Sequence, residues 1–410
     1  MAGAPTLGYA AVPAHVSVTE EPAQASSSTG AMPAPTLEEF FQFLHCSLKK
    51  EAQHHLKAQV RFKTSTSDFS MWDDFETFVK PNLGANEKWV PYHTVFGVHE
   101  WYHIKELHGE IAKDWEPKHR FLATFIFRAH CKRDLFEEVQ LPLLRDKDFW
   151  RQPLVRFGHG DLMEEALLKY RRNTKKPLQT AAFRAIPPKE LLDDRDANLV
   201  RSIINRTRSL LMAAEKIWPY ITDNEHNATH KFDEMSRVLR STKGCGPTWT
   251  KMLLVSIDLA YPDLGLLVSQ CDVGVGAVQP LRALLGTLDN ATVEDPKASL
   301  IRLTELFNKN KSRASDEFWD ALALVERKAR SKYKGATLVQ KQLRTERGQV
   351  GAGTLQVQLC EYRQFRNSRA RSRFGLEDGD PLMTAPETCA RRLSEHSSPG
   401  RKRKLPTVRQ

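Results

Sequence analysis

The stretch LRSTKGCGPTWTKMLLVSIDLAYP, which begins at Leu239, decides the predicted fold. An amphipathic helical pattern leads into it, and an apolar helical pattern continues after Pro247. Between the two patterns, Gly244 and Gly246 permit a tight turn that residues with side chains would strain. Pro247 suits the first position of a helix, because its missing N–H would have no partner there in any case. The stretch therefore predicts two helices joined by a hairpin over residues 239–260.

A turn of this kind exposes backbone N–H groups at the start of the second helix, which is a ready site for phosphate. The pattern is typical of a helix-hairpin-helix motif, which grips the DNA backbone without reading its sequence. An ordinary turn between two helices, with glycines that serve packing only, is the alternative interpretation. We predict that the hairpin binds DNA through Lys243, Gly244, Gly246, Thr248 and Lys251.

Composition and charge favour a globular protein with a polyanionic partner. The chain has 410 residues, of which 40% are hydrophobic, and 61 Lys and Arg against 50 Asp and Glu give a net charge of +11. A basic excess of this size favours nucleic acid, because neutralised phosphates release counterions; basic tails on a soluble protein are the alternative. Six widely spaced cysteines without a C-x-x-C pair indicate free thiols. We expect no membrane segment, because no apolar run is long enough.

The ends of the chain differ in composition from its middle. Residues 1–35 are rich in Ala, Pro, Ser and Thr, which predicts a disordered tail. Residues 36–375 carry helical patterns, beginning behind Thr36 as a cap, and predict an all-α domain. Residues 376–410 predict a disordered basic tail. Its Arg401–Lys404 run resembles a nuclear localisation sequence, which places the protein in the nucleus, although a tail that only aids solubility is the alternative.

Apolar stripes mark the individual helices of the predicted domain. They run over residues 121–129, 203–217 and 232–239 with helical spacing. Residues 180–187 are the one stretch that we interpret as a short extended piece.

Asp272 is the first candidate catalytic residue. It lies 26 residues after Gly246, and glycosylases with a helix-hairpin-helix carry an essential Asp at a similar distance. A carboxylate there would stabilise positive charge that develops on a sugar, or would activate a nucleophile. An Asp that caps the next helix is the alternative.

Three blocks resemble the helical domain of the 5-hydroxymethyluracil DNA kinase family, which includes the alpha-glutamyl/putrescinyl thymine pyrophosphorylases. The first is Phe121–Arg128, continuing through KRDLF; the second runs from Gly244–Pro247 to IDLAY at Ile257–Tyr261. The third, Leu359–Phe365, is similar to the closing Leu-Cys-Glu-Phe-x-Lys-Tyr motif of the family. The blocks occur in the order found in the family.

The resemblance implies a DNA-glycosylase-like helical fold that acts on 5-hydroxymethyluracil, or its phosphorylated form, in double-stranded DNA. Kinase members would phosphorylate the hydroxymethyl group, and pyrophosphorylase members would displace pyrophosphate from it. Either transfer needs the base outside the helical stack. A base-excising glycosylase and a catalytically silent DNA-binding module on the same fold are the alternatives.

The chain departs from the family pattern at several positions. Gly274–Ala277 reads GVGA where the family has Gly-Pro-Gly-Ala, and Gln364 and Phe365 replace the Lys and Tyr of the closing motif. No G-x-x-x-x-G-K-[ST] loop is present, so the sequence indicates no particular cofactor.

Glu361 and Arg128 complete the predicted catalytic set. Glu361 lies in the last of the three blocks and Arg128 in the first, so the two side chains meet if these blocks converge. Arg128 would then orient a phosphate, with Glu361 holding it in place. A buried Glu–Arg pair of purely structural value is the alternative.

Two further patterns concern metal and charge. His99, Glu100 and His103 match H-E-x-x-H, which on an α-helix would place two imidazoles on one face for zinc. We interpret the match as accidental and predict no metal site, with a zinc hydrolase as the remaining alternative. Arg363 and Arg366 belong to an arginine series interleaved with aromatic residues, which predicts contact with DNA, a solvated helix face being the alternative.

Overall fold

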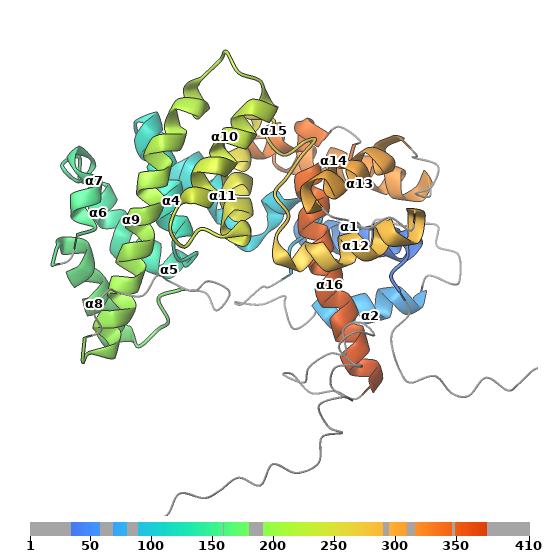
Figure 1. The fold of residues 1–410 in the computed structure, drawn as a ribbon, viewed down its shortest axis with the longest axis horizontal. Helices are drawn as coiled ribbons and strands as arrows, with labels where there is room; N and C mark the ends of the chain where they lie inside the picture. Colours follow the sequence, from blue (N-terminus) through green and yellow to red (C-terminus); the bar gives the residue numbers. More distant parts are fainter. Residues whose placement is uncertain are drawn as a thin grey trace, which may run out of the picture. The chain divides into compact units, whose positions relative to one another are not determined.

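The glycine-rich stretch forms two helices with a turn between them. In the computed structural model, α10 (Ala228–Ser241) ends before the turn and α11 (Pro247–Ala260) begins after it. The two helices pack against each other (Figure 1). Asn227 caps α10, because its side chain accepts a hydrogen bond from the backbone N–H of His230 at 2.9 Å.

The structure describes residues 34–57, 69–79, 89–158, 160–179, 192–289, 295–309, 316–346 and 349–374. All of them belong to one compact unit, and every regular element among them is a helix, which confirms the all-α prediction for this part of the chain. The predicted extended piece at 180–187 lies outside the described residues, as do the predicted tails except for residues 34 and 35. Among the described helices, none combines the length and the apolar character that crossing a bilayer requires.

The predicted helix starts and stripes are confirmed. α1 (Leu37–Leu56) begins directly after Thr36, whose hydroxyl accepts a hydrogen bond from the backbone N–H of Glu39 at 3.1 Å. The first apolar stripe forms α4 (Pro117–Arg128), and the second forms α9 (Arg195–Thr222). α9 packs against α4 (Figure 1).

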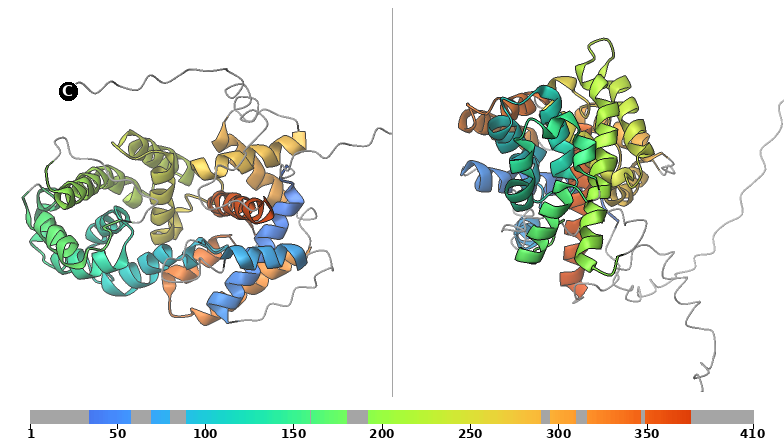
Figure 2. Two further views of the ribbon diagram at one scale, coloured as in Figure 1. Left: turned by 90° about the horizontal axis from the view of Figure 1, so that it is seen from below. Right: turned by 90° about the vertical axis from the view of Figure 1, so that its left-hand side faces the viewer.

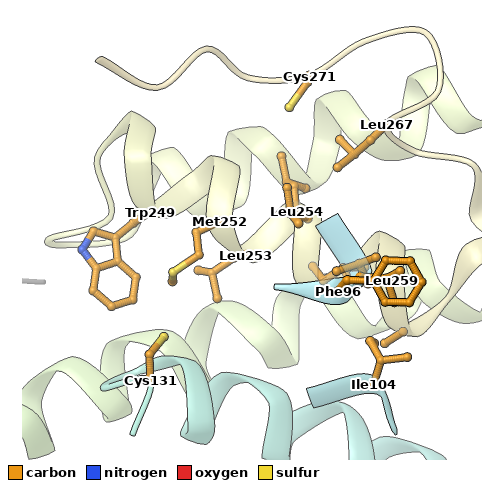
Figure 3. Close-up of a cluster of buried hydrophobic side chains, with 14 of the residues drawn as sticks. Phe96, Ile104, Cys131, Trp249, Met252, Leu253, Leu254, Leu259, Leu267 and Cys271 are labelled. Atoms are coloured by element: carbon orange, nitrogen blue, oxygen red, sulfur yellow. The ribbon is translucent and has the colours of Figure 1, made fainter. Parts of the chain in front are cut away.

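α11 is buried on nearly all sides. From Trp249 to Ala260 every side chain except Lys251 is buried. Figure 3 shows Trp249, Met252 and Leu253 directed toward the loop that carries Cys131, while Leu254 lies on the side of the following loop at Leu267. An apolar helix surrounded by other helices buries its whole circumference, so α11 has no solvated face beyond its first turn.

A second group of helices assembles around α16 (Ala352–Phe374), which packs against α12 (Val275–Asp289). Figure 2 shows α16 end-on in its left-hand view, with α1 and α12 beside it. Aromatic rings join α16 to α1: the centroid of the Phe43 ring lies 5.4 Å from those of Tyr362 and Phe365, and 5.6 Å from that of Phe75. Such ring pairs stabilise a core beyond the area that they bury.

The remaining helical elements connect and cover the helices around α11 and those around α16. They are α2 (Phe69–Val79), η2 (Thr94–Phe96), α3 (Val98–Trp101), η3 (Tyr102–Ile111), α5 (Arg133–Leu135), η4 (Phe136–Gln140), α6 (Leu141–Leu144), η5 (Phe149–Arg151), α7 (Pro153–Arg156), α8 (Leu162–Thr174), η6 (Pro262–Leu264), α13 (Pro296–Lys309), α14 (Asp316–Lys332) and α15 (Thr337–Glu346). Two of them, η3 and η4, are π-helices rather than α-helices.

Replacing Phe43 tests the aromatic cluster. Phe43→Ala removes a fully buried ring that contacts four others, so we expect the free energy of unfolding to fall by about 3–5 kcal/mol. Urea denaturation followed by circular dichroism measures this change. Leu162→Ala is the matched control, because Leu162 is 53% exposed, and we expect it to change stability by about 0.5 kcal/mol or less. Equal losses in both variants would contradict the assignment of the cluster as core.

Candidate nucleic-acid interface

The turn between α10 and α11 depends on a backbone conformation that favours glycine. Gly244 has φ of +76°, in the left-handed region. The backbone N–H of Thr242 donates to the carbonyl of Leu239, and that of Cys245 donates to the carbonyl of Thr242, both at 3.0 Å. Gly246 is extended, and a Cβ built there would meet no atom within 4 Å. The chain at Gly246 therefore faces open space.

Arg206 supports the turn from the interior. It extends from α9, and its Nη1 donates a hydrogen bond to the carbonyl oxygen of Gly244 at 2.6 Å. Its guanidinium lies over the Trp249 ring, 4.2 Å from the centroid, in a cation–π contact. Both side chains are buried. One arginine thus fixes the carbonyl of the turn and the start of α11 in a single arrangement.

The predicted DNA-binding residues of the hairpin lie at its surface. Exposed are Lys243, Gly244, Gly246 and Thr248, whereas Lys251 is half-buried. No side chain caps α11, and Pro247 at its first position carries no N–H. The amides in the first turn of an α-helix, such as that of Thr248, have no partner within the helix. The positive end of the helix dipole at this start favours an anion.

Asp272 lies beside the hairpin but is occupied by protein partners. Its side chain is 1% exposed and accepts a hydrogen bond from the Ser236 hydroxyl at 2.6 Å. It also forms an ion pair with Arg240, which is 53% exposed in the last turn of α10. Asp272 does not cap the next helix, because α12 begins three residues later. The carboxylate holds the guanidinium of Arg240, a side chain that is half exposed near the turn.

The segment after Asp272 brings the start of α11 close to α16. A Cβ built at Gly274 would lie 3.3 Å from Gln356 Nε2, 3.8 Å from Lys251 Cε and 3.9 Å from Thr248 Oγ1. A Cβ at this position would therefore fit closely between the three groups, with a small shift of the Gln356 amide. The structure thus places the predicted residues Thr248 and Lys251 close to Gln356 of α16. The sequence analysis did not predict that α16 lies beside the hairpin.

Glu361, on the same helix as Gln356, is a buried carboxyl group. It is 4% exposed, and its Oε1 accepts a hydrogen bond from Gln364 Nε2 at 3.3 Å. Burial raises its pKa from the ordinary value of 4.5 to about 8, and the Val90 amide and the charge of Lys251 lower it only in part. At neutral pH this carboxyl group mostly keeps its proton. A neutral acid in such a place donates hydrogen bonds and suits a general acid.

Arg128 does not meet Glu361, so the predicted pairing of these two residues is wrong. Its Nη2 forms an ion pair with Glu100 Oε1 at 2.7 Å, and its Nε donates to the Ser256 hydroxyl at 2.7 Å. Arg128 is 1% exposed. Burial alone would raise the pKa of Glu100, but the Arg128 guanidinium lowers it, so that the pair is ionised. Arg128 therefore joins α4 to α11 and α3 and has no access to a phosphate.

The H-E-x-x-H motif lies where the chain changes from an α-helix to a π-helix. In η3 residues five apart, not four, share a face, so His103 pairs with His108: their ring centroids are 4.7 Å apart. Both Nε2 atoms lie 2.9 Å from Thr124 Oγ1. Glu100 is bound to Arg128. Within the described residues no group of His, Cys, Asp and Glu has the geometry of a metal site, and this arrangement does not support a zinc hydrolase.

The arginines predicted on α16 differ in their surroundings from the hairpin lysines. Arg366 Nε lies 3.7 Å from Glu39 of α1, and its guanidinium lies 5.9 Å from the centroid of the Tyr362 ring. Arg363 is half-buried on the same helix. Arg366 therefore joins α16 to α1, and a phosphate would have to replace Glu39 to bind it.

Sequence reasoning missed Arg206, Arg240 and Gln356. The sequence does contain one signal for Arg206. It is a charged residue on the apolar face of α9, three residues after Ile203 and four before Leu210. A cation on a buried face requires a specific partner. No pattern in the sequence distinguishes Arg240 or Gln356, whose roles depend on the path of the chain after α11.

Removing the ionisable group at Glu361 tests its buried state. Because the folded-state pKa lies above the unfolded value, the native protein binds this proton more tightly, and stability falls as pH rises from about 4.5 to 8. Glu361→Gln abolishes this loss. We expect the variant and the wild type to be about equally stable at pH 4.5, and the variant to be more stable at pH 9. Urea unfolding at both pH values measures the difference, and a pH-independent difference would contradict the buried acid.

Comparisons with known proteins identify no family for this chain. No protein-family model, no curated protein and no solved structure matches the chain. The likeness of the three sequence blocks to the 5-hydroxymethyluracil DNA kinase helical domain therefore stays a prediction. The interface is defined by its own contacts: an exposed turn, an uncapped helix start, flanking cations, and the arginine that supports them.

Proposed function

We propose that the chain is a helix-hairpin-helix protein that binds the backbone of double-stranded DNA and modifies a thymine-derived base. One observation carries this proposal: the turn of residues 242–248 exposes an uncapped helix start, and Arg206 supports it from the interior. A phosphate bound there would accept hydrogen bonds from first-turn amides and would lie near the charge of Lys243, with Arg240 beside it and paired to Asp272.

The chemistry of the turn favours the DNA backbone over base edges. Its donors are backbone amides and flexible cations, which suit phosphate oxygens and carry no sequence preference. The half-buried Lys251 adds a further charge at the inner edge of the turn. The net charge of +11 supports a polyanionic partner, since attraction to phosphate dominates binding of this kind. A nuclear protein with access to duplex DNA is the setting that we infer.

The base-modifying part of the proposal is supported by Glu361 and by the three sequence blocks. A carboxyl group whose pKa is raised to about 8 keeps its proton at neutral pH. Such a group can donate its proton to a phosphate or pyrophosphate as it leaves a 5-hydroxymethyl carbon. We infer a transferase on 5-hydroxymethyluracil or its phosphorylated form, within a DNA-glycosylase-like fold.

A catalytically silent DNA-binding module is the second candidate, and the state of Asp272 favours it. The carboxylate is nearly inaccessible and already bound to Arg240 and Ser236. In this arrangement Asp272 serves binding, because it positions Arg240, and a base-excising glycosylase that needs a free Asp is disfavoured. The two candidates share the hairpin and differ only in turnover.

Gly246 provides a direct test of DNA binding. A Cβ at this position would meet no atom within 4 Å, and the backbone angles are ordinary, so that Gly246→Glu should fold normally. Its carboxylate would face the phosphate, and we expect the affinity for duplex DNA to fall by more than about tenfold at moderate salt. Fluorescence anisotropy with a labelled duplex measures the affinity.

Gly246→Ala is the matched control, because it adds a side chain without charge, and we expect its affinity to stay within about twofold of the wild type. Equal melting temperatures would show that both variants fold. If Gly246→Glu binds duplex DNA as tightly as Gly246→Ala, the hairpin is not the DNA contact.

Turnover separates the enzyme from the silent module. The protein is incubated with duplex DNA that contains 5-hydroxymethyluracil, with and without ATP, and the digested nucleosides are analysed by mass. We expect a modified nucleoside with the wild type, and loss of it in Glu361→Gln with DNA affinity retained. Binding without any modified nucleoside would support the silent module and contradict the transferase.

A further inference from the structure

A cavity of about 970 Å³ lies at the end of α11 opposite the hairpin turn. Since α11 has 14 residues, the two features are roughly 20 Å apart along the helix. The cavity is bounded by η3, α4, the start of α10, η6 and the segment from the end of α14 into α15. None of the residues that we assign to the DNA interface lines it.

The lining of the cavity carries an excess of positive charge. Five basic side chains face it, against two acidic ones. Lys105 and Lys341 are neutralised, because Lys105 pairs with Glu110 at 3.2 Å and Lys341 pairs with Asp263. The excess charge therefore comes from the other three: Arg120, Lys231 and Lys332.

These three cations hydrogen bond to backbone carbonyl oxygens instead of carboxylates. Arg120 donates to the carbonyl of Lys113 at 3.3 Å, Lys231 to that of Asp223, and Lys332 to that of His55. In the part of the chain that the structure describes, none of them forms an ion pair with a carboxylate. Lys231 is only 6% exposed, so its charge is far from bulk water. A buried charge is costly, and that of Lys231 is offset by the backbone carbonyl of Asp223 and by attraction to the carboxylate of the same residue, without an ion pair. An anionic ligand would supply the ion pair that these contacts do not.

Neutral donors and a helix start complete the lining. The first turn of α15, at Thr337–Val339, borders the cavity, and first-turn amides favour an anion. Burial raises the pKa of Tyr261 to about 12, so that its hydroxyl remains a neutral donor beside Arg120. Burial and the charge of Arg120 lower the pKa of His108 to about 3, so that this imidazole is neutral and adds no charge.

We propose that this cavity binds a nucleoside di- or triphosphate. Three cations without carboxylate partners and a helix start match a ligand with two or more phosphate groups. The volume exceeds what phosphate groups alone require and falls within the range of small-molecule sites. Apolar side chains such as Ile104 and Leu264 line the same cavity and suit a base or sugar. The site does not depend on DNA binding, because the hairpin lies at the other end of α11.

Calorimetry with the full chain tests the site with ATP, pyrophosphate and adenosine as probes. We expect ATP to bind, pyrophosphate to bind more weakly, and adenosine to bind at least about tenfold more weakly than ATP, since the cations recognise phosphate. Arg120→Gln and Lys332→Gln should each weaken ATP binding by about tenfold. Both side chains are only partly buried or exposed, so that neither substitution removes core contacts.

Two lysines provide matched controls with the same loss of charge. Lys169→Gln on the exposed face of α8 and Lys243→Gln in the hairpin should leave ATP affinity unchanged within about twofold. Equal weakening by Lys169→Gln would show non-specific attraction, and selective weakening by Lys243→Gln would place ATP at the hairpin. Either result would overturn the proposal. It would also be overturned if adenosine bound as tightly as ATP, or if ATP did not bind. The proposal would also be overturned if duplex DNA displaced ATP while Arg120→Gln bound ATP as tightly as the wild type.

Discussion

The contact of Arg206 with Gly244 and Trp249 is the interaction on which the proposed interface depends. The glycine carbonyl belongs to a tight turn with left-handed backbone, and such a turn has few conformations of its own that are favourable. A guanidinium that binds the carbonyl and packs on the first-turn Trp249 joins both sides of the turn to α9. The amides at the start of α11 are therefore presented in a fixed arrangement, and a phosphate would not have to order them.

Charge is organised differently at the two ends of α11. At the hairpin, the cations stand at the surface, and Asp272 directs Arg240 outward rather than receiving a substrate. At the opposite end, Arg120, Lys231 and Lys332 line a cavity and donate hydrogen bonds to backbone carbonyl oxygens. An exposed set of cations suits an extended polyanion, and an enclosed set suits a small one. The helix between them is buried along its length and couples the positions of both sites.

The sequence predicted the parts of the structure that local patterns determine. The cap at Thr36, the amphipathic stripes and the interruption at Gly244 are local, and the structure has them where they were expected. The predicted pairing of Arg128 with Glu361 was wrong because it required two distant segments to converge. Arg128 instead donates a hydrogen bond to Ser256 and forms an ion pair with Glu100. The H-E-x-x-H pattern assumed α-helical spacing, which the π-helix at η3 replaces with a five-residue repeat. The raised pKa of Glu361 depends on how deeply the fold buries this carboxyl group, which composition alone does not reveal.

Hydrogen–deuterium exchange with and without duplex DNA tests the central claim most directly. The account predicts that DNA slows exchange at the amides of residues 242–250, including those of Thr248 and Trp249, because phosphate accepts hydrogen bonds from the start of α11. Exchange in the arginine-rich part of α16 should change little, since Arg366 is already paired with Glu39. Tight DNA binding that leaves exchange at residues 242–250 unchanged would contradict the account.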